Sequence, residues 1–446
     1  MFDDTPLRPG LAPVEGLDIH ARFDGGARSS DGGVPLLREI ERKTGVSDVL
    51  ASCLADRRGP ARVTHSRAAM IRARVMAIAC GDEDCGDLDA LRHDPAMKTA
   101  CQRVPDAAPG LASQPTLSRL ENLAGLRALA RMGLMMIDLF CGSFSRPPAE
   151  IVPGIDDTID RTHGGQQLSL CSTHADGHRF QPVDICGAAT GRPVACLLRP
   201  GRRPSGAEAA QVLRQVIRRI RANWPRVAVT RRGDGHHGTP EVTDLPEGPG
   251  CPCIPGLPGS ARLKEIVHPW RGDAATRRAI TGKPKVRRFF ETRCAAGSWA
   301  CERRDIARIE ATAMGADARP VVTNMGGRSR HLYETPYCAR GVMENLIREH
   351  KPYTKSDRAS CHRWEASRFR LMLHTAAYWL PHRLRGAAPK RSRWRTATFE
   401  TLRAAFLKIA VRVEQLKTRI RLSLPPACRH APMIAPMLRR THAQGP

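Results

Sequence analysis

The order of predicted strands and helices before residue 235 most constrains the fold of this chain. Alternating apolar and polar side chains predict three strands, at residues 151–159, 178–186 and 192–198. A helix follows, because Ser205 and Glu208 have the spacing of a capping box and apolar residues then recur at helical intervals. A buried strand beginning at residue 227 ends at Asp234. Three strands, a helix and a further strand predict an α/β fold built on one sheet.

Carboxylates mark two of these strands. Asp156 and Thr158 share one face of the first strand, and Asp157 lies on the other face. Asp234 stands at the C-terminal end of its strand, where open α/β sheets place their sites. Asp234 is therefore expected at a functional site.

The stretch 337–351 reads as a further helix. At about 3.6 residues per turn, Tyr337, Arg340, Glu344 and Lys351 fall within about 60° of one another on its surface. One interpretation is a solvated face with a salt bridge. The other is a functional stripe, because an acid, two bases and a phenol stand where a core-facing helix would carry aliphatic side chains.

The N-terminal part is predicted to be helical, and its helix at residues 111–122 has polar groups that suit DNA recognition. Ser118, Arg119 and Asn122 are expected to be exposed. Short polar side chains and an arginine fit a helix-turn-helix reader of phosphates or guanine edges. The alternative is an ordinary well-capped surface helix.

The interval between Asp234 and Glu344 is longer than a direct link between a strand and a helix needs. It is therefore expected to hold an inserted subdomain. Its strand-like pieces are residues 262–267, 285–292, 305–312 and 320–324. The C-terminal third is predicted to be helical, with helices at residues 364–380 and 399–421 and a disordered tail.

Prolines are expected to disrupt regular secondary structure at two places. Residues 245–258 contain five prolines, so this stretch is predicted not to supply a strand of the central ladder. Pro381 is predicted to interrupt the helix that precedes it.

The charge of the chain restricts its partners. Lys+Arg 71 against Asp+Glu 44 gives +27, and the excess is spread along the chain. A polyanion-binding surface is expected, with nucleic acid as the first candidate and an anionic membrane surface as the second. No apolar run approaches the ~20 residues of a spanning helix, and the start of the chain lacks the layout of a signal peptide, so a cytoplasmic location is expected. The 15 cysteines include no C-x2-C couple, and reduced thiols are expected.

The spacing Tyr-x2-Arg-x3-Glu-x6-Lys in residues 337–351 resembles the signature of bacterial insertion-sequence DDE transposases with a Tyr-Arg-Glu-Lys motif. Residues 155–167, 199–208 and 232–242 resemble one branch of them, insertion-sequence family thirteen-eighty. The resemblance implies a ribonuclease-H-like catalytic core with a β-rich insertion, flanked by an α-helical N-terminal domain and C-terminal helices. The implied domains are a DNA-end-binding domain at 1–145, a catalytic domain at 150–380 with an insertion at about 245–330, and basic C-terminal helices and a tail at 381–446.

The resemblance also implies a site. Its motifs assign Asp156, Asp234 and Glu344 as the catalytic carboxylates and metal ligands, with Asp157 as the alternative to Asp156. Three adjacent carboxylates repel one another unless a cation lies between them, and oxygen ligands select Mg²⁺ or Mn²⁺. The accompanying contacts to phosphates and DNA are Tyr337, Arg340 and Lys351.

The function that the resemblance implies is transposition of an insertion sequence. A homodimer assembled on DNA would bind the terminal inverted repeats, cut the DNA and join it to target DNA in the nucleoid. One alternative is a catalytically inactive copy that acts only as a basic DNA-binding protein. Another is a metal-dependent nuclease without strand transfer.

Overall fold

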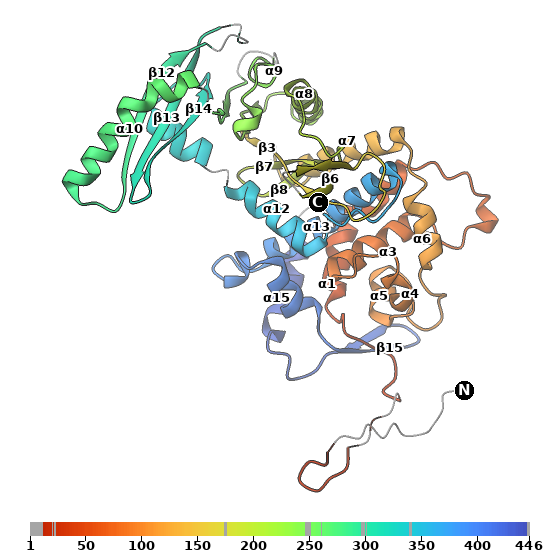
Figure 1. Ribbon diagram of the computed structural model, residues 1–446. Coiled ribbons are helices and arrows are strands. Elements are labelled where there is room, and N and C mark those ends of the chain that lie inside the picture. The colour runs from red at the N-terminus through yellow and green to blue at the C-terminus, as the bar shows by residue number, and fades with distance from the viewer. Residues whose placement is uncertain are drawn as a thin grey trace.

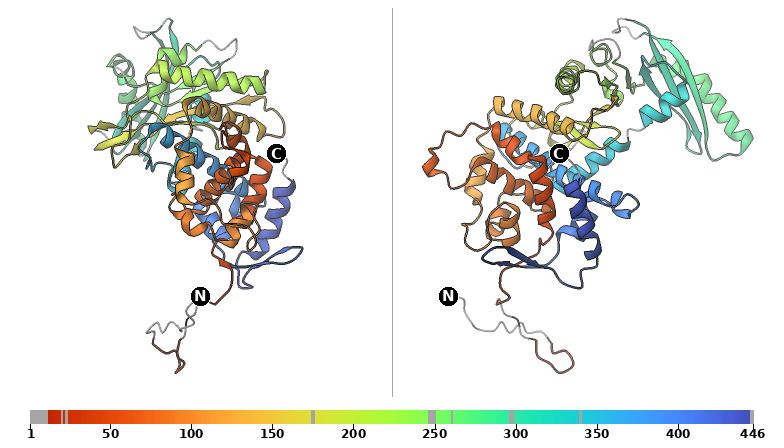
Figure 2. Two further views of the ribbon diagram at one scale, coloured as in Figure 1. Left: turned by 90° about the vertical axis from the view of Figure 1, so that its right-hand side faces the viewer. Right: turned by 180° about the vertical axis from the view of Figure 1, so that it is seen from behind.

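A computed structural model describes residues 12–19, 21, 24–173, 176–245, 251–259, 261–295, 299, 301–338 and 341–443. Its mixed α/β character is as predicted. Figure 1 shows a central sheet between a helical body, to which both ends of the chain contribute, and a projecting unit of one long helix and three strands. The same projection is seen from two other sides in Figure 2.

The central sheet has five strands in the order β11-β10-β3-β7-β8. These are β3 (Pro153–Asp157), β7 (Val183–Gly187), β8 (Arg192–Leu197), β10 (Arg231–Gly233) and β11 (Cys253–Pro255). Strand β7 runs antiparallel to β3 and to β8, whereas β10 runs parallel to β3 and to β11. Helix α8 (Gly206–Asn223) lies between β8 and β10 in the chain and begins at the predicted capping box of Ser205 and Glu208. The predicted succession of strands and helix is confirmed.

Strand β11 corrects the prediction for the proline-rich stretch. Residues 253–255 form a strand of the central sheet, although residues 245–258 were predicted not to supply a strand of the central ladder. β11 is the edge strand, so it needs ladder partners on one side only, and edge strands tolerate proline. The Arg231 amide donates to the Pro252 carbonyl, and the Cys253 amide donates to the Asn324 side chain, outside the ladder. Residues 246–250 lie outside the described residues.

Three small sheets complete the described part of the core and its surroundings. Their strands are β1 (Arg28–Ser29), β2 (Glu150–Ile151), β4 (Asp160–Arg161), β5 (Leu170–Ser172), β6 (Gly177–Phe180), β9 (Ala228–Val229), β15 (Val411–Gln415) and β16 (Ile420–Ser423). The stretch 178–186, predicted as one strand, therefore contains two, β6 and β7, which belong to different sheets.

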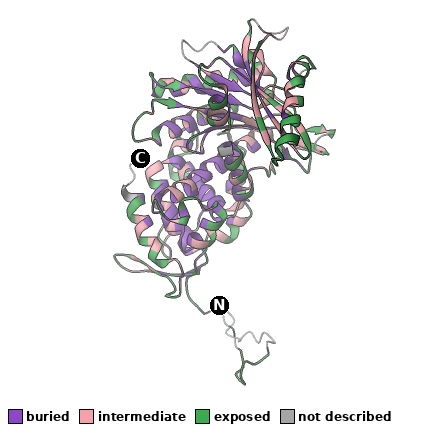
Figure 3. Cartoon of the chain, turned by 90° about the vertical axis from the view of Figure 1, so that its left-hand side faces the viewer, coloured by how far each residue is buried: buried purple, intermediate pink, exposed green. Residues whose placement is uncertain are grey.

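The helical body is organised around α13 (Trp364–Ala387). The N-terminal helices are α1 (Val34–Thr44), α2 (Val46–Ser52), α3 (Arg67–Cys80), α4 (Asp87–Leu91), α5 (Pro95–Ala100), α6 (Gln114–Glu121) and α7 (Leu126–Gly142). Helices α1, α3 and α7 pack against α13, and so does strand β8. One hydrophobic cluster therefore runs from the N-terminal helices through the sheet to the C-terminal segment, and Figure 3 shows this buried material in both parts.

Helix α13 also corrects the prediction for Pro381. The helix was predicted to end there, but it continues to Ala387. Leu380, Leu384 and Ala387 are all buried on either side of the proline. Packing of this segment outweighs the roughly 3 kcal/mol that a proline costs inside a helix.

The projecting unit consists of helix α10 (Ala261–Thr281) packed on an antiparallel sheet of β12 (Val286–Cys294), β13 (Arg303–Thr312) and β14 (Gly315–Thr323). The strands predicted at 285–292, 305–312 and 320–324 overlap with these three. The strand predicted at 262–267 is wrong, because this segment is the start of α10. Leu263 and Val267 are one helical turn apart and pack together with Ala307 of β13.

The helix predicted at 399–421 is also wrong. The segment forms α14 (Phe399–Leu402), a π-helical turn η7 (Arg403–Leu407) and the β15–β16 hairpin. Val411 and Val413 are buried on one face of β15, which pairs with β1 near the other end of the chain. The tail predicted to be disordered contains helix α15 (Ala431–Ala443), whose Met437 is fully buried.

The remaining described helices connect these units. They are η1 (Pro60–Arg62), η3 (Gly235–His237), α9 (Pro240–Thr243), α11 (Ser329–Leu332), the π-helical turn η4 (Tyr333–Tyr337), α12 (Gly341–Thr354) and η6 (Arg393–Arg395). None of the described helices combines the length and the apolar composition needed to cross a bilayer.

Two histidines of α13, the buried His374 and the half-buried His382, predict acid sensitivity. Burial lowers the pKa of His382 to about 3 and that of His374 well below its ordinary value. Both rings are neutral in the folded state, whereas in the unfolded chain they bind a proton below a pH of about 6.5. Each contributes stability that is present above that pH and is lost as the pH falls, by up to about 1.4 kcal/mol per pH unit.

The variant His382→Gln should therefore lose free energy of unfolding less steeply than the parent between pH 6.5 and pH 5, as measured by urea denaturation. The exposed His268 of α10 supplies the control, and His268→Gln should keep the parent's slope. Equal slopes for the parent and His382→Gln would contradict the assignment.

Candidate functional site

Strands β3 and β10 bring two of the predicted aspartates to neighbouring strand ends. Gly154 pairs with Arg232 and Ile155 with Gly233, so Asp156 and Asp234 follow at corresponding positions. Asp156 also lies opposite Asp184 of β7. Because side chains alternate along a strand, Asp156 shares the face of Asp184 and Asp157 takes the other face.

Asp234 is held by the turn that follows it. It caps η3, where its Oδ1 accepts from the His236 amide at 2.9 Å and lies 2.8 Å from Nδ1 of His237. Burial alone would raise the pKa of this carboxyl, but the hydrogen bond from His237 and the charges of both histidines lower it to about 2. Asp234 is thus an ionised carboxylate, and Nδ1 of His237 must carry the donated proton.

The third member of this group is Asp157. One ligand atom each from Asp157, Asp234 and His237 lies within 4.8 Å of the others. Gln181 donates to Oδ2 of Asp157. In the described part of the chain, Oδ1 of Asp157 and Nε2 of His237 are buried and have no hydrogen-bond partner. Two carboxylates and an imidazole with unused lone pairs fit a divalent cation.

Glu344 lies on α12, which docks on the face of the sheet that carries Asp156. Met343 is buried and its sulfur contacts the sulfur of Cys186 on β7, whereas Glu344 is exposed. Among the described residues, the group formed by Asp157, Asp234 and His237 does not include Glu344. The predicted helix is confirmed from residue 341 onward.

Tyr337 ends the turn η4 and is half-buried against the loop beside Asp234. A Cβ atom at Gly256 would lie 2.8 Å from the Tyr337 hydroxyl and 3.1 Å from the backbone carbonyl carbon of Asp234. Only glycine allows this close approach, so the phenol lies next to the backbone of the candidate site. Arg340 lies outside the described residues.

Lys351 makes its contacts within the protein. Its ammonium group donates to the Ile159 carbonyl at 2.8 Å and to Oδ1 of Asp160 at 2.6 Å. The Asp160 side chain is only 2% exposed. Burial raises the pKa of Asp160 to about 6, against the opposing charge of Lys351. Lys351 therefore ties the C-terminal half of α12 to the segment that follows β3.

The three predicted reader residues lie on α6 or at its C-cap. Arg119 and Asn122 are exposed and Ser118 is half-buried. The Asn122 amide donates to the Ser118 carbonyl, and Arg119 donates to the Thr116 hydroxyl. The exposed pair is available to a partner, and the local bonds fix its orientation.

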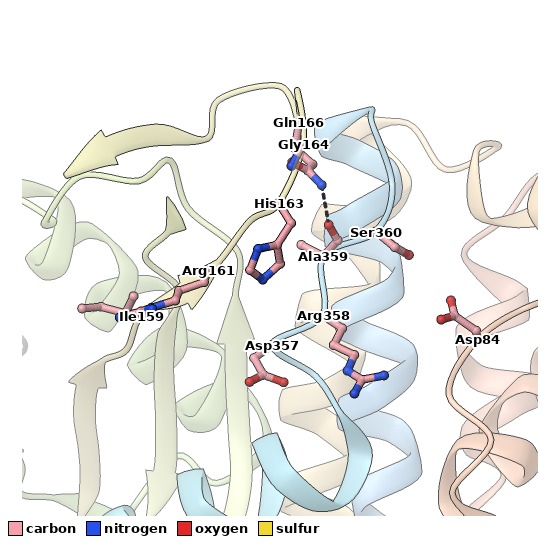
Figure 4. Close-up of a pocket in the computed structure, with 10 residues that line it drawn as sticks. All are labelled: Asp84, Ile159, Arg161, His163, Gly164, Gln166, Asp357, Arg358, Ala359 and Ser360. Carbon is pink, nitrogen blue, oxygen red and sulfur yellow. Dashed lines mark hydrogen bonds between the residues drawn. The ribbon is translucent and has the colours of Figure 1, made fainter. Parts of the chain in front are cut away.

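A cavity of about 850 Å³ opens just beyond the end of β3 (Figure 4). It lies between the loop 162–167 and the loop that joins α12 to α13, and Gln166 donates across it to the Ala359 carbonyl at 3.0 Å. Its charged and imidazole side chains are Asp84, Arg161, His163, Asp357 and Arg358. Two aspartates and two arginines thus give this cavity a polar lining of mixed charge.

Sequence reasoning missed His237 and the loop 357–360. His237 was detectable as a histidine three residues after Asp234, within reach of the carboxylate across one tight turn. The loop has no local signature, because its relation to residues 159–166 arises only from the packing of distant segments.

One comparison with known proteins agrees with the resemblance to DDE transposases. The profile of one protein family, described as "Transposase DDE domain group 1", matches residues 11–444. No curated protein matches the chain. Among solved structures, a cryo-EM structure of a piggyBac transposase synaptic complex with hairpin DNA is similar, with 10% sequence identity, coverage of 85% of this chain and 80% of that chain, and a TM-score of 0.42.

The ion pair between Lys351 and Asp160 leads to a stability prediction. Lys351→Met leaves a buried carboxylate without its cation, so the free energy of unfolding should fall by about 3 kcal/mol. Adding Asp160→Asn should restore part of the loss, because the uncompensated charge is then removed. Urea denaturation measures both effects. Lys417 is exposed, and an equally small loss in Lys351→Met and Lys417→Met would contradict the prediction.

Proposed function

The chain belongs to the transposase DDE domain family, and from this membership we propose that it binds the ends of an insertion sequence, cuts the DNA there and joins it to target DNA. The observation that carries the proposal is the placement of Asp156, Asp157 and Asp234 at adjacent strand ends, where Asp157 and Asp234 have ligand atoms within 4.8 Å of each other and of His237.

The sheet supports a ribonuclease-H-like core. Three successive antiparallel strands, β3, β7 and β8, are followed by helix α8 and then by β10, which returns beside β3 in parallel. This is the succession that the resemblance implies. It places Asp156 and Asp157 on the central strand and Asp234 at the end of its parallel neighbour, and α12 with Glu344 then covers one face.

Asp234 is the common member of two possible carboxylate sets. On one side it approaches Asp157. On the other side, Asp156 stands next to Asp234 in the register of the sheet. Asp156 lies on the face of the sheet that α12 contacts, and α12 carries Glu344. We propose Asp156, Asp234 and Glu344 as the catalytic set, with Asp157 as the alternative to Asp156. A Mg²⁺ or Mn²⁺ ion bound there would supply activation of an oxygen nucleophile and charge stabilisation at phosphorus.

The residues around the carboxylates fit a DNA substrate. Arg161 and His163 line the cavity beside the strand end. These groups would hold the phosphates that flank the scissile bond, while Tyr337 rests on the backbone next to Asp234. Arg119 and Asn122 on the surface of α6 are proposed to read the terminal repeats, and a homodimer is proposed to form on the DNA.

The alternative of an inactive DNA-binding copy was motivated by the prolines at 245–258. Strand β11 pairs with β10 in regular parallel register despite those prolines. This observation favours the catalytic proposal, and metal-dependent nicking separates the two.

Glu344→Gln should abolish cleavage and leave DNA binding intact. The change removes a carboxylate from the proposed metal site, so nicking in Mg²⁺ or Mn²⁺ should fall at least ~100-fold. Glu344 is exposed, so folding should not change. Asp234→Asn should behave in the same way, and the stronger of the two effects of Asp156→Asn and Asp157→Asn identifies the first carboxylate.

The control for this series is Glu302→Gln, which alters an exposed acid before β13. Gel shifts in Ca²⁺ report binding, and nicking of an end fragment reports cleavage. If the parent nicks DNA and the Glu344→Gln variant nicks it equally well, Glu344 does not belong to the catalytic site. A parent that binds but never nicks would favour the inactive alternative.

Binding to DNA should depend strongly on salt. Each phosphate neutralised by the protein contributes about −0.9 to the slope of log K against log salt. Arg161→Gln, in the cavity wall, should reduce the magnitude of the slope by about 0.9. Arg419→Gln, on the exposed turn between β15 and β16, should leave the slope unchanged. Fluorescence anisotropy at several salt concentrations measures these slopes, and an identical slope for Arg161→Gln and the parent would remove Arg161 from the DNA contact.

A further inference from the structure

A second group of metal-ligating side chains lies inside the protein, away from the strand ends. Asp184 of β7, Cys196 of β8 and His350 of α12 each place one ligand atom within 4.8 Å of the other two. Asp184 and His350 are 3% and 4% exposed, and Cys196 is half-buried. Figure 1 shows the three elements next to one another at the centre of the molecule.

The donor types are those that zinc prefers. Thiolate sulfur, imidazole nitrogen and carboxylate oxygen are the usual zinc ligands, and in a tetrahedral site such atoms lie roughly 3.5 Å apart. The three donors are thus close to binding distances before any ion is present.

The surroundings of His350 orient it for this role. Its Nδ1 lies 3.3 Å from the Ser356 hydroxyl, and its Nε2 lies 3.3 Å from the Thr375 hydroxyl. A ligating histidine usually makes a hydrogen bond with its second nitrogen, which fixes the ring. Ser356 can supply that bond to Nδ1, and Nε2, whose present partner is the Thr375 hydroxyl, is then the ligand atom.

The charges around Asp184 also favour a bound cation. Asp160 and Asp184 are both buried, but Lys351 pairs with Asp160. In the described part of the chain, no lysine or arginine lies within ion-pair distance of Asp184. A buried carboxylate without a counter-charge is costly. A zinc ion bound by this carboxylate and one thiolate would make the group neutral.

We propose that Asp184, Cys196 and His350 form a structural zinc site that fastens α12 to strands β7 and β8. Helix α12 carries both His350 and Glu344, and Asp184 lies directly opposite Asp156 in the sheet. The ion would therefore hold the helix that carries Glu344 against β7, the strand that pairs with β3 and its Asp156. The site does not depend on whether the chain transposes DNA.

The competing arrangement contains no metal. In it the Cys196 thiol keeps its proton and donates to Asp184, a hydrogen bond that the geometry also allows. The two arrangements differ in metal content and in the spectrum of a cobalt-substituted protein, so they can be separated directly.

The experiment uses the full-length protein, dialysed against zinc and then against metal-free buffer. Elemental analysis should find about one zinc per chain, and replacement by Co²⁺ should give the thiolate-to-cobalt charge-transfer band of a sulfur-ligated site. Cys196→Ser and His350→Gln should each lose the zinc, and Cys196→Ser should lose the band. Cys171→Ser, at an exposed cysteine of β5, is the matched control and should keep both.

Chelation provides a readout that needs no variant. Removing zinc from the parent should lower its Tm, and Zn²⁺ but not Mg²⁺ should restore it, because an ion bound only by the folded state stabilises that state. If Cys196→Ser fails to fold, His350→Gln and the chelated parent carry the test. A parent without zinc, or a cobalt band that survives in Cys196→Ser, would overturn the site.

The outcome of the zinc experiment is also independent of the outcome of the DNA-nicking experiment. A variant that loses zinc but still nicks DNA would confirm a structural site and leave the proposed catalysis standing. A parent that binds zinc but never nicks would confirm the site and remove only the catalytic proposal.

Discussion

The burial of α13 is the constraint on which the rest of the structure depends. The helix is covered by the N-terminal helices α1, α3 and α7, by strand β8 and by the C-terminal α15. Buried polar side chains of the helix also make contacts beyond it, as with His374, whose Nδ1 contacts the Thr354 carbonyl. Buried polar contacts of this kind allow one register only. The sheet and the helical body therefore share one core, and the strand ends keep a fixed position relative to the loops that border the cavity.

The buried charged groups are of two kinds. One kind forms ion pairs that stabilise the fold, and the other lies at the proposed metal sites. Arg74 pairs with Glu121 at 3.0 Å, and Arg72 with Glu41 at 2.9 Å, inside the helical body. Such pairs are satisfied, and they hold elements together. The carboxylates of β3, β7 and β10 differ, because Asp157 and Asp184 lie beside other metal-ligating groups. The protein places its uncompensated carboxylates where a dication can supply the missing charge.

The sequence predicted the elements whose signals are local. The capping box of Ser205 and Glu208 and the position of Asp234 at a strand end are both confirmed. It failed where the decisive partner is distant. Residues 411–415 fit a helical pattern until β1, near the other end of the chain, is known as their ladder partner. Strand β11 likewise depends on Asn324, which receives the amide that the ladder leaves unused.

The choice between Asp156 and Asp157 could not be made from the sequence for a related reason. Alternation along β3 puts the two carboxylates on opposite faces, and Asp234 stands at the end of the adjacent strand, within reach of either. The side to which Asp234 turns is set by His237, whose Nδ1 binds it across the turn η3. In a site built with Asp156 and Glu344, the Asp234 carboxylate must give up its hydrogen bond from the His237 imidazole and bind a metal ion instead. The bond to His237 therefore holds Asp234 ionised and oriented until such an ion competes for it.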